Sequence, residues 1–147
     1  MNLDSEDARH RFASARVAHL ATADREGRPH IVPVTFAEAD GHVYIAIDSK
    51  PKRTTDLKRL RNIRENAAVS LLADRYDDDW SQLWWARADG SARIVDATGD
   101  AEWMVPLALL QQRYPQYVES IPEGPMIIVS VDRWSGWSFT DSAKLLA

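Results

Sequence analysis

The segment DSKPKRTTDLKRLRNIREN, residues 48–66, carries the strongest chemical signal in the sequence. Seven of the chain's eighteen Lys and Arg residues lie in it. Lys50 and Lys52 flank a proline where a strand is expected to end and a helix to begin. A helix start offers unpaired backbone N–H groups and about half a positive charge. Together these groups suit a phosphate, whereas Arg61 and Arg64 are better explained as part of a solvated helix face.

The positive charge is confined to this segment. The chain has a net charge of −4, and the segment's seven basic and three acidic residues leave −8 for the remainder. A nucleic-acid-binding surface usually spreads basic residues over a whole face. The distribution therefore disfavours a nucleic-acid partner and favours a small anionic ligand.

Other catalytic and binding motifs are missing. The chain has no cysteine, and its four histidines are widely spaced without a metal-binding motif, so no metal site is indicated. It contains neither a dinucleotide-binding glycine motif nor a P-loop. Ser49 and Lys52 match S-x-x-K, but the partner motifs of that hydrolase class are absent. These absences favour chemistry carried by a bound cofactor.

The length and composition predict one domain over residues 1–147, with 45% hydrophobic residues. No stretch approaches the ~18 apolar residues of a membrane span, and the charged N-terminus does not resemble a signal peptide. We therefore expect a soluble, cytoplasmic protein with no membrane partner.

The elements that must position the basic segment are mostly strands. A helix is predicted over 5–15, anchored by Phe12. Three strands of a meander should follow, with a hairpin turn at Asp40-Gly41. Two prolines in the second of these strands argue for an irregular or an edge strand. The predicted strands lie at 16–24, 28–39, 42–48, 67–76, 83–97 and 125–139.

Two further helices are predicted. In the first, Leu57, Leu60 and Ile63 face the core, and Thr54 or Thr55 caps the start. Arg59 and Asn62 are then left with the other polar residues at the flanks and the outer face. The second helix covers 100–114, with Pro106 tolerated near its first turn. The strand at 67–76 should be central, and Gly90 should mark a bulge or a close backbone approach.

Half of the six tryptophans, Trp80, Trp84 and Trp85, lie within six positions. Trp84 and Trp85 must point to opposite faces of their strand. At least one therefore leaves the core, toward a partner subunit or a flat ligand. The alternative, for one of the pair, is packing under the second helix.

The sequence resembles the pyridoxamine 5'-phosphate oxidase-like split β-barrel family, and within it the actinobacterial branch that uses the deazaflavin coenzyme F420. ARVAHLATADREGRPHIVPVTF is similar to the family's opening strand pair. IDSKPKRTTDLKRLRNIRENAAVSLLADRY is similar to its phosphate turn, helix and next strand. DDDWSQLWWARADGSARIV is similar to its following strand. The resemblance implies a mainly β, FMN-binding-like split barrel with flanking helices.

The resemblance also implies a homodimer with two cofactor sites at the subunit interface. The backbone around Val32, Pro33 and Val34 would line the deazaflavin ring. Trp80 and Trp84 would lie near the ring or substrate, from the same or from the other subunit, and Trp137 would cap the pocket. The residues that would hold the phosphate and tail are Ser49, Lys50, Lys52, Arg59 and Asn62.

The implied activity is an F420-dependent oxidoreductase that passes a hydride between the cofactor and an unidentified electron-poor small molecule. No residue need act as a catalytic base, and the proton comes from solvent or from a donor such as His30. Two alternatives stay open. One is an FMN-dependent oxidase or reductase of the same fold, and the other is a non-catalytic binder of F420 or a tetrapyrrole.

Overall fold

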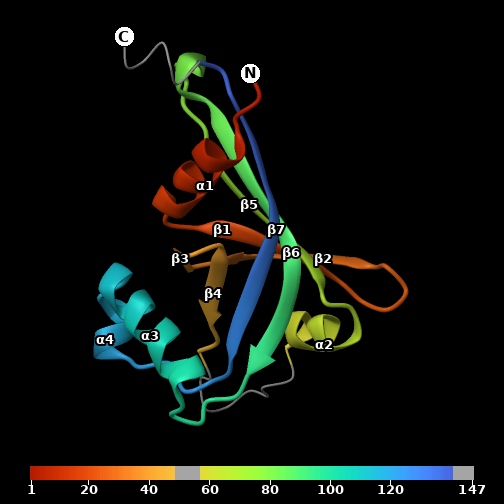
Figure 1. The fold of residues 1–147 in the computed structure, drawn as a ribbon, viewed down its shortest axis with the longest axis vertical. Coiled ribbons are helices and arrows are strands. Elements are labelled where there is room, and N and C mark those ends of the chain that lie inside the picture. The colour runs from red at the N-terminus through yellow and green to blue at the C-terminus, as the bar shows by residue number, and fades with distance from the viewer. Residues whose placement is uncertain (49–56, 141–147) are drawn as a thin grey trace.

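The chain folds around one antiparallel sheet whose two edge strands are neighbours in the sequence. The computed structural model describes residues 1–48 and 57–140. The seven strands have the order β2-β1-β5-β6-β7-β4-β3. β2 (Pro29–Val34) and β3 (Ala37–Ala39) form the two edges. Because only two residues separate them, the sheet curls into a barrel (Figure 1).

The predicted mainly β split barrel with flanking helices is confirmed. The described strands and helices, besides β2 and β3, are α1 (Ser5–Ser14), β1 (Ala18–Ala23), β4 (His42–Ala46), α2 (Lys58–Glu65), β5 (Ala68–Arg75), the 3₁₀ turn η1 (Trp80–Gln82), β6 (Trp84–Val95), α3 (Ala101–Arg113), α4 (Gln116–Glu119) and β7 (Met126–Ser138). None of the helices in these residues is long and apolar enough to cross a membrane.

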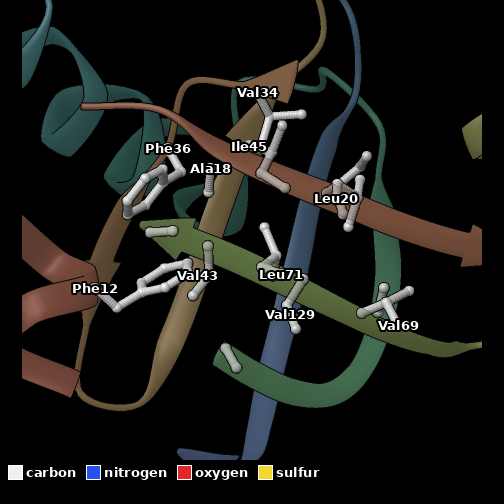
Figure 2. Close-up of a cluster of buried hydrophobic side chains, with 14 of the residues drawn as sticks. Phe12, Ala18, Leu20, Val34, Phe36, Val43, Ile45, Val69, Leu71 and Val129 are labelled. Atoms are coloured by element: carbon white, nitrogen blue, oxygen red, sulfur yellow. The ribbon is translucent and has the colours of Figure 1, made fainter. Parts of the chain in front are cut away.

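The main core fills the inside of the barrel. Figure 2 shows Phe12 of α1 and side chains such as Leu20, Leu71 and Val129 converging from separate strands. A second core lies on the other face of β3, β4 and β7, where α3 packs through Trp103 and its neighbours. The remaining outer face of β1, β5 and β6 carries no helix (Figure 1).

The predicted strand over 28–39 is wrong, because the chain turns a corner at Thr35 and Phe36 and forms two strands. Tyr114 closes this corner: its hydroxyl accepts from the Phe36 N–H at 3.2 Å and lies 3.0 Å from the Phe36 carbonyl oxygen. Thr35 Oγ1 lies 2.6 Å from the Tyr117 hydroxyl. The backbone of Phe36 is therefore satisfied by Tyr114, which directly follows α3, and the Thr35 side chain is bonded to Tyr117 of α4.

Several local predictions can be judged directly. β2 is an edge strand and β5 an interior one, as predicted. The ladder between β6 and β7 shifts register at Gly90, where a Cβ would collide with the Ser130 carbonyl oxygen. Pro106 lies inside α3 instead of in its first turn. α2 begins at Lys58, later than predicted, and Thr54 and Thr55 lie outside the described residues.

Candidate functional site

The inward face of α2 holds two of the predicted ligand-binding residues. Asn62 is fully buried and Arg59 is half-buried, whereas the other cations of the helix are exposed. The prediction that both lie at the flanks or the outer face is therefore wrong. Residues three apart drift by about 60° around a helix. At about 100° per residue, Arg59 and Ile63 lie at the middle of the buried face, with Leu60 on one side and Asn62 on the other.

The Arg59 guanidinium has no anionic partner in the part of the chain that the structure describes. Its Nε is buried without a hydrogen-bond partner. Burial also lowers the pKa of Arg59. A partly desolvated cation is unfavourable unless an anion compensates it. This guanidinium is therefore suited to a phosphate or carboxylate ligand.

A buried hydrogen bond joins α2 to the barrel wall. Asn62 Nδ2 donates to Thr22 Oγ1 at 3.0 Å, and the two residues are 0% and 3% exposed. His30 lies directly opposite Thr22 in the ladder between β1 and β2, so its side chain shares that face. His30 is half-buried, and its Nδ1 lacks a hydrogen-bond partner among the described residues. The predicted proton donor therefore lies on the sheet face that α2 covers.

The Asp24 N–H donates to the Arg28 carbonyl oxygen at 3.2 Å, and this bond shows which residues of β2 direct their backbone groups toward β1. Bonded pairs alternate along an antiparallel ladder. Every second residue from Arg28, including Val32 and Val34, therefore bonds to β1. Ile31 and the prolines on either side of it present their backbone to the free edge. Because proline has no N–H, the Ile31 N–H is the donor of this edge.

This pairing refines the predicted ring-lining backbone. Val34 is buried and Val32 packs against the core, so their side chains point inward. Of the three predicted residues, only Pro33 has a backbone carbonyl at the free edge. Ile31, which the sequence analysis did not single out, adds an N–H there, and its side chain is 65% exposed. The signal that could have found it is its position midway between Pro29 and Pro33.

A shallow groove of about 480 Å³ lies on the outer face of β1, β5 and β6. Small side chains such as Ala21 and Ala68 form its floor. Ser70 Oγ donates to Asp89 Oδ1 at 2.6 Å, and Arg87 Nε donates to Asp89 Oδ2 at 3.0 Å. Both oxygens of Asp89 are therefore engaged within the chain, and the floor of the groove is flat and largely apolar.

Trp84 and Trp85 point to opposite faces of β6, as predicted. Trp84 packs against the barrel core, with the Arg11 guanidinium of α1 5.9 Å from its ring centroid. Trp84 therefore packs against α1. The predicted alternative, packing under the second helix, does not hold for Trp84. Trp85 lies on the outer face and pairs with Trp137 across the ladder between β6 and β7. Trp85, to which no role was assigned, is thus the member of the pair that leaves the core.

The predicted site residues fall into two groups at opposite ends of the sheet. Trp80, which is 61% exposed, lies with Trp84 and Trp137 where β6 begins and β7 ends. α2 packs against β1 and the other part of β6 (Figure 1). The stretch of β6 from Trp84 to Gly90 alone is about 20 Å long at the usual rise of a strand. One chain therefore does not bring the two groups together.

Three predicted phosphate ligands, Ser49, Lys50 and Lys52, lie outside the described residues. Within the described ranges, no three His, Asp or Glu side chains converge in a way that could hold a metal ion.

Solved structures share this fold. A FAD-binding protein from Mesorhizobium loti matches with a TM-score of 0.73 and 18% identity, over 92% of this chain and 95% of that one. The haem storage protein HutZ from Vibrio cholerae matches with a TM-score of 0.69 and 19% identity, over 94% and 95%. The FAD-binding protein from Mycobacterium smegmatis matches with a TM-score of 0.65 and 20% identity, over 95% and 100%. At these identities the likeness establishes the fold alone.

No curated protein matches the sequence. The family model described as pyridoxamine 5'-phosphate oxidase, however, matches residues 5–138, nearly the whole chain. The chain therefore belongs to the pyridoxamine 5'-phosphate oxidase family.

Proposed function

We propose that the protein is a homodimeric oxidoreductase that binds coenzyme F420 and passes a hydride between it and an electron-poor organic molecule. The observation that carries this proposal is Arg59, a half-buried guanidinium without an anionic partner in the described residues. Family membership supports a cofactor with a phosphate group. The preference for F420 rests on the resemblance of residues 47–76 to the deazaflavin branch.

The residues present fit such a cofactor. Arg59 would bind the phosphate or an acidic group of the tail, together with Lys50 and Lys52 of the preceding segment. The free edge of β2 offers the Ile31 N–H and the Pro33 carbonyl to the polar rim of a flat ring. A charge-assisted hydrogen bond from Arg59 to an anionic group contributes about 1.5–3 kcal/mol.

When bound in its reduced form, F420 supplies a hydride, and a proton completes the two-electron reduction of the substrate. The chain's own part is to hold the two flat molecules in contact and to exclude water from between them. Two sources are proposed for this proton: solvent, and His30, which lies on the sheet face that α2 covers. The proposed site requires no catalytic base.

A dimer would complete the site. Within one chain, the tryptophans at the start of β6 are separated from α2 by much of the length of the sheet (Figure 1). In a symmetric dimer the same patch of both subunits forms the interface. Trp80 and Trp137 of one subunit could then meet Arg59 of the other.

Flavin and tetrapyrrole binding are the alternatives. The Mesorhizobium loti and Mycobacterium smegmatis structures of this fold are described as FAD-binding proteins, and HutZ as a haem storage protein. FMN carries a phosphate and haem carries carboxylates, so Arg59 suits all of these ligands. The alternatives are therefore an FMN-dependent oxidase or reductase and a non-catalytic F420 or tetrapyrrole binder.

The test is a parallel titration of the purified protein with F420, FMN and haem, followed by fluorescence or absorbance. We expect the tightest binding for F420, and we expect Arg59→Ala to weaken it by about tenfold or more. Arg64→Ala, an exposed cation on the same helix, is the matched control and should change the affinity little. Tight FMN binding without F420 binding would make the flavin enzyme the better assignment, and haem binding alone would favour a storage protein.

A further inference from the structure

We propose that the buried hydrogen bond between Thr22 and Asn62 positions the guanidinium of Arg59 on the inward face of α2. Thr22 and Asn62 are then positioning residues for the anion that Arg59 binds. The inference rests on the proposed function for the identity of that anion, but the placement of Arg59 can be tested without any ligand.

The first argument is the polarity of Asn62 in an apolar setting. Leu60, two positions before it, and Ile63, directly after it, are 0% and 5% exposed and belong to the main core. Asn62 is buried as deeply, yet only its Nδ2 has a partner, and its Oδ1 is buried without one among the described residues. An apolar residue would seal this contact without that desolvation cost. A directional hydrogen bond adds what apolar packing lacks, namely a fixed rotation of the helix.

The second argument is the spacing of Asn62 and Arg59. Residues three apart in a helix are neighbours on one face, so the rotation that seats Asn62 against Thr22 also turns Arg59 inward. A shift of α2 by one residue would rotate its side chains by about 100°. In one direction Arg59 would take the exposed position of Lys58, and its Nε would no longer be buried. In the other direction it would take the core position of Leu60, where a cation is unfavourable.

The third argument is that the other polar contacts from α2 to the β1–β2 turn are exposed. The Arg25 N–H donates to Glu65 Oε2 at 3.1 Å, and Arg25 Nη2 lies 3.7 Å from Glu65 Oε1. Lys58 Nζ lies 3.8 Å from Asp24 Oδ2, and the Lys58 side chain is 43% exposed. Exposed pairs of this kind contribute little and hold no fixed geometry. The bond between Thr22 and Asn62 is therefore the buried polar contact, among the described residues, that can set the rotation of α2.

The direct test is the Arg59 Nε–H signal in a ¹H–¹⁵N spectrum of the protein without ligand, assigned by its loss in Arg59→Lys. A buried Nε–H should exchange slowly with water. We expect Thr22→Val, which keeps the shape but removes the acceptor, to speed this exchange toward that of an exposed arginine. Thr22→Ser keeps the hydroxyl and should preserve the slow exchange. If Thr22→Val does not fold, Asn62→Leu removes the same bond from the other side.

A second measurement connects the placement to binding. FMN and riboflavin differ only in the phosphate, so the ratio of their dissociation constants reports the phosphate contact. Arg59→Ala and Thr22→Val should both reduce the preference for FMN, by about tenfold for Arg59→Ala. The double variant should be no worse than Arg59→Ala alone, because both changes remove one interaction.

The outcomes separate the two proposals. Unchanged Arg59 exchange in a folded Thr22→Val protein would overturn the positioning role, whatever ligand the protein binds. Altered exchange in Thr22→Val, together with an Arg59→Ala protein that keeps its preference for FMN over riboflavin, would support the positioning role and contradict the phosphate contact.

Discussion

Asp24 shows how one carboxylate stabilises the turn between β1 and β2. Its Oδ1 accepts the backbone N–H groups of Arg28 at 3.0 Å and of Glu26 at 2.9 Å. These bonds, with the nearby charge of Lys58, lower the pKa of Asp24. The folded pKa is below the unfolded one, so the stabilisation is complete above the unfolded value, about 3.9, and is lost as the pH falls through the folded value.

We therefore expect Asp24→Asn to be less stable than the natural protein near neutral pH and to differ from it less as the pH falls. Asparagine keeps an acceptor oxygen but does not titrate, so its curve of Tm against pH should be flatter below about pH 4. Thermal unfolding between about pH 7 and pH 2 would measure this. Parallel curves for the two proteins would show that Asp24 does not contribute to the acid sensitivity.

At the same scale, the residues of the candidate site were only partly predictable. The cluster of cations in residues 48–66 is visible in the sequence, but the rotation of α2 is not. That rotation depends on the contact of Asn62 with Thr22, which is distant in sequence and has no motif. The backbone roles in β2 could have been found, because two prolines two residues from Ile31 identify which backbone groups face the free edge.

Among the elements, β6 and β7 form the longest ladder, and Gly90 is where their register shifts. A Cβ at this position would collide with the carbonyl oxygen of Ser130. The clash is with backbone, which cannot move aside without separating the strands. We expect Gly90→Ala to lower the unfolding free energy by about 1–3 kcal/mol, measured by urea unfolding. Ser91→Ala, next to it and exposed, is the control, and an equal effect of both would contradict the close approach.

Most elements followed from local patterns, because alternating apolar residues and turns such as Asp40-Gly41 act within a few residues. The corner at Thr35 and Phe36 did not. The sequence alternates on both sides of it, so nothing local shows that the chain leaves one edge of the sheet and joins the other. The partners that stabilise the corner, Tyr114 and Tyr117, are distant in sequence. The periodicity of apolar residues in the sequence cannot predict a tertiary contact of this kind.

On the scale of the whole molecule, one face of the sheet is left open. Figure 1 shows helices against other parts of the barrel, while the outer face of β1, β5 and β6 is uncovered. Leu72 of β5 is 37% exposed on it, Ile31 of the neighbouring β2 is 65% exposed beside it, and Trp85 and Trp137 lie at its far end. Aromatic and large aliphatic residues are typical of subunit interfaces. This face is therefore the surface that the proposed homodimer would bury.

If the homodimer buries the outer face of β1, β5 and β6, a charge placed on this face should separate the subunits. We expect Leu72→Glu to convert a dimer into a folded monomer in sedimentation experiments, because an unpaired carboxylate would be buried at the interface. Val118→Glu, on α4 and 60% exposed, is the matched control and should leave the dimer intact. Because Trp80 and Trp137 would come from the second subunit, the monomer should also bind F420 much more weakly. A Leu72→Glu monomer that binds F420 with full affinity would mean that each chain forms a complete site by itself.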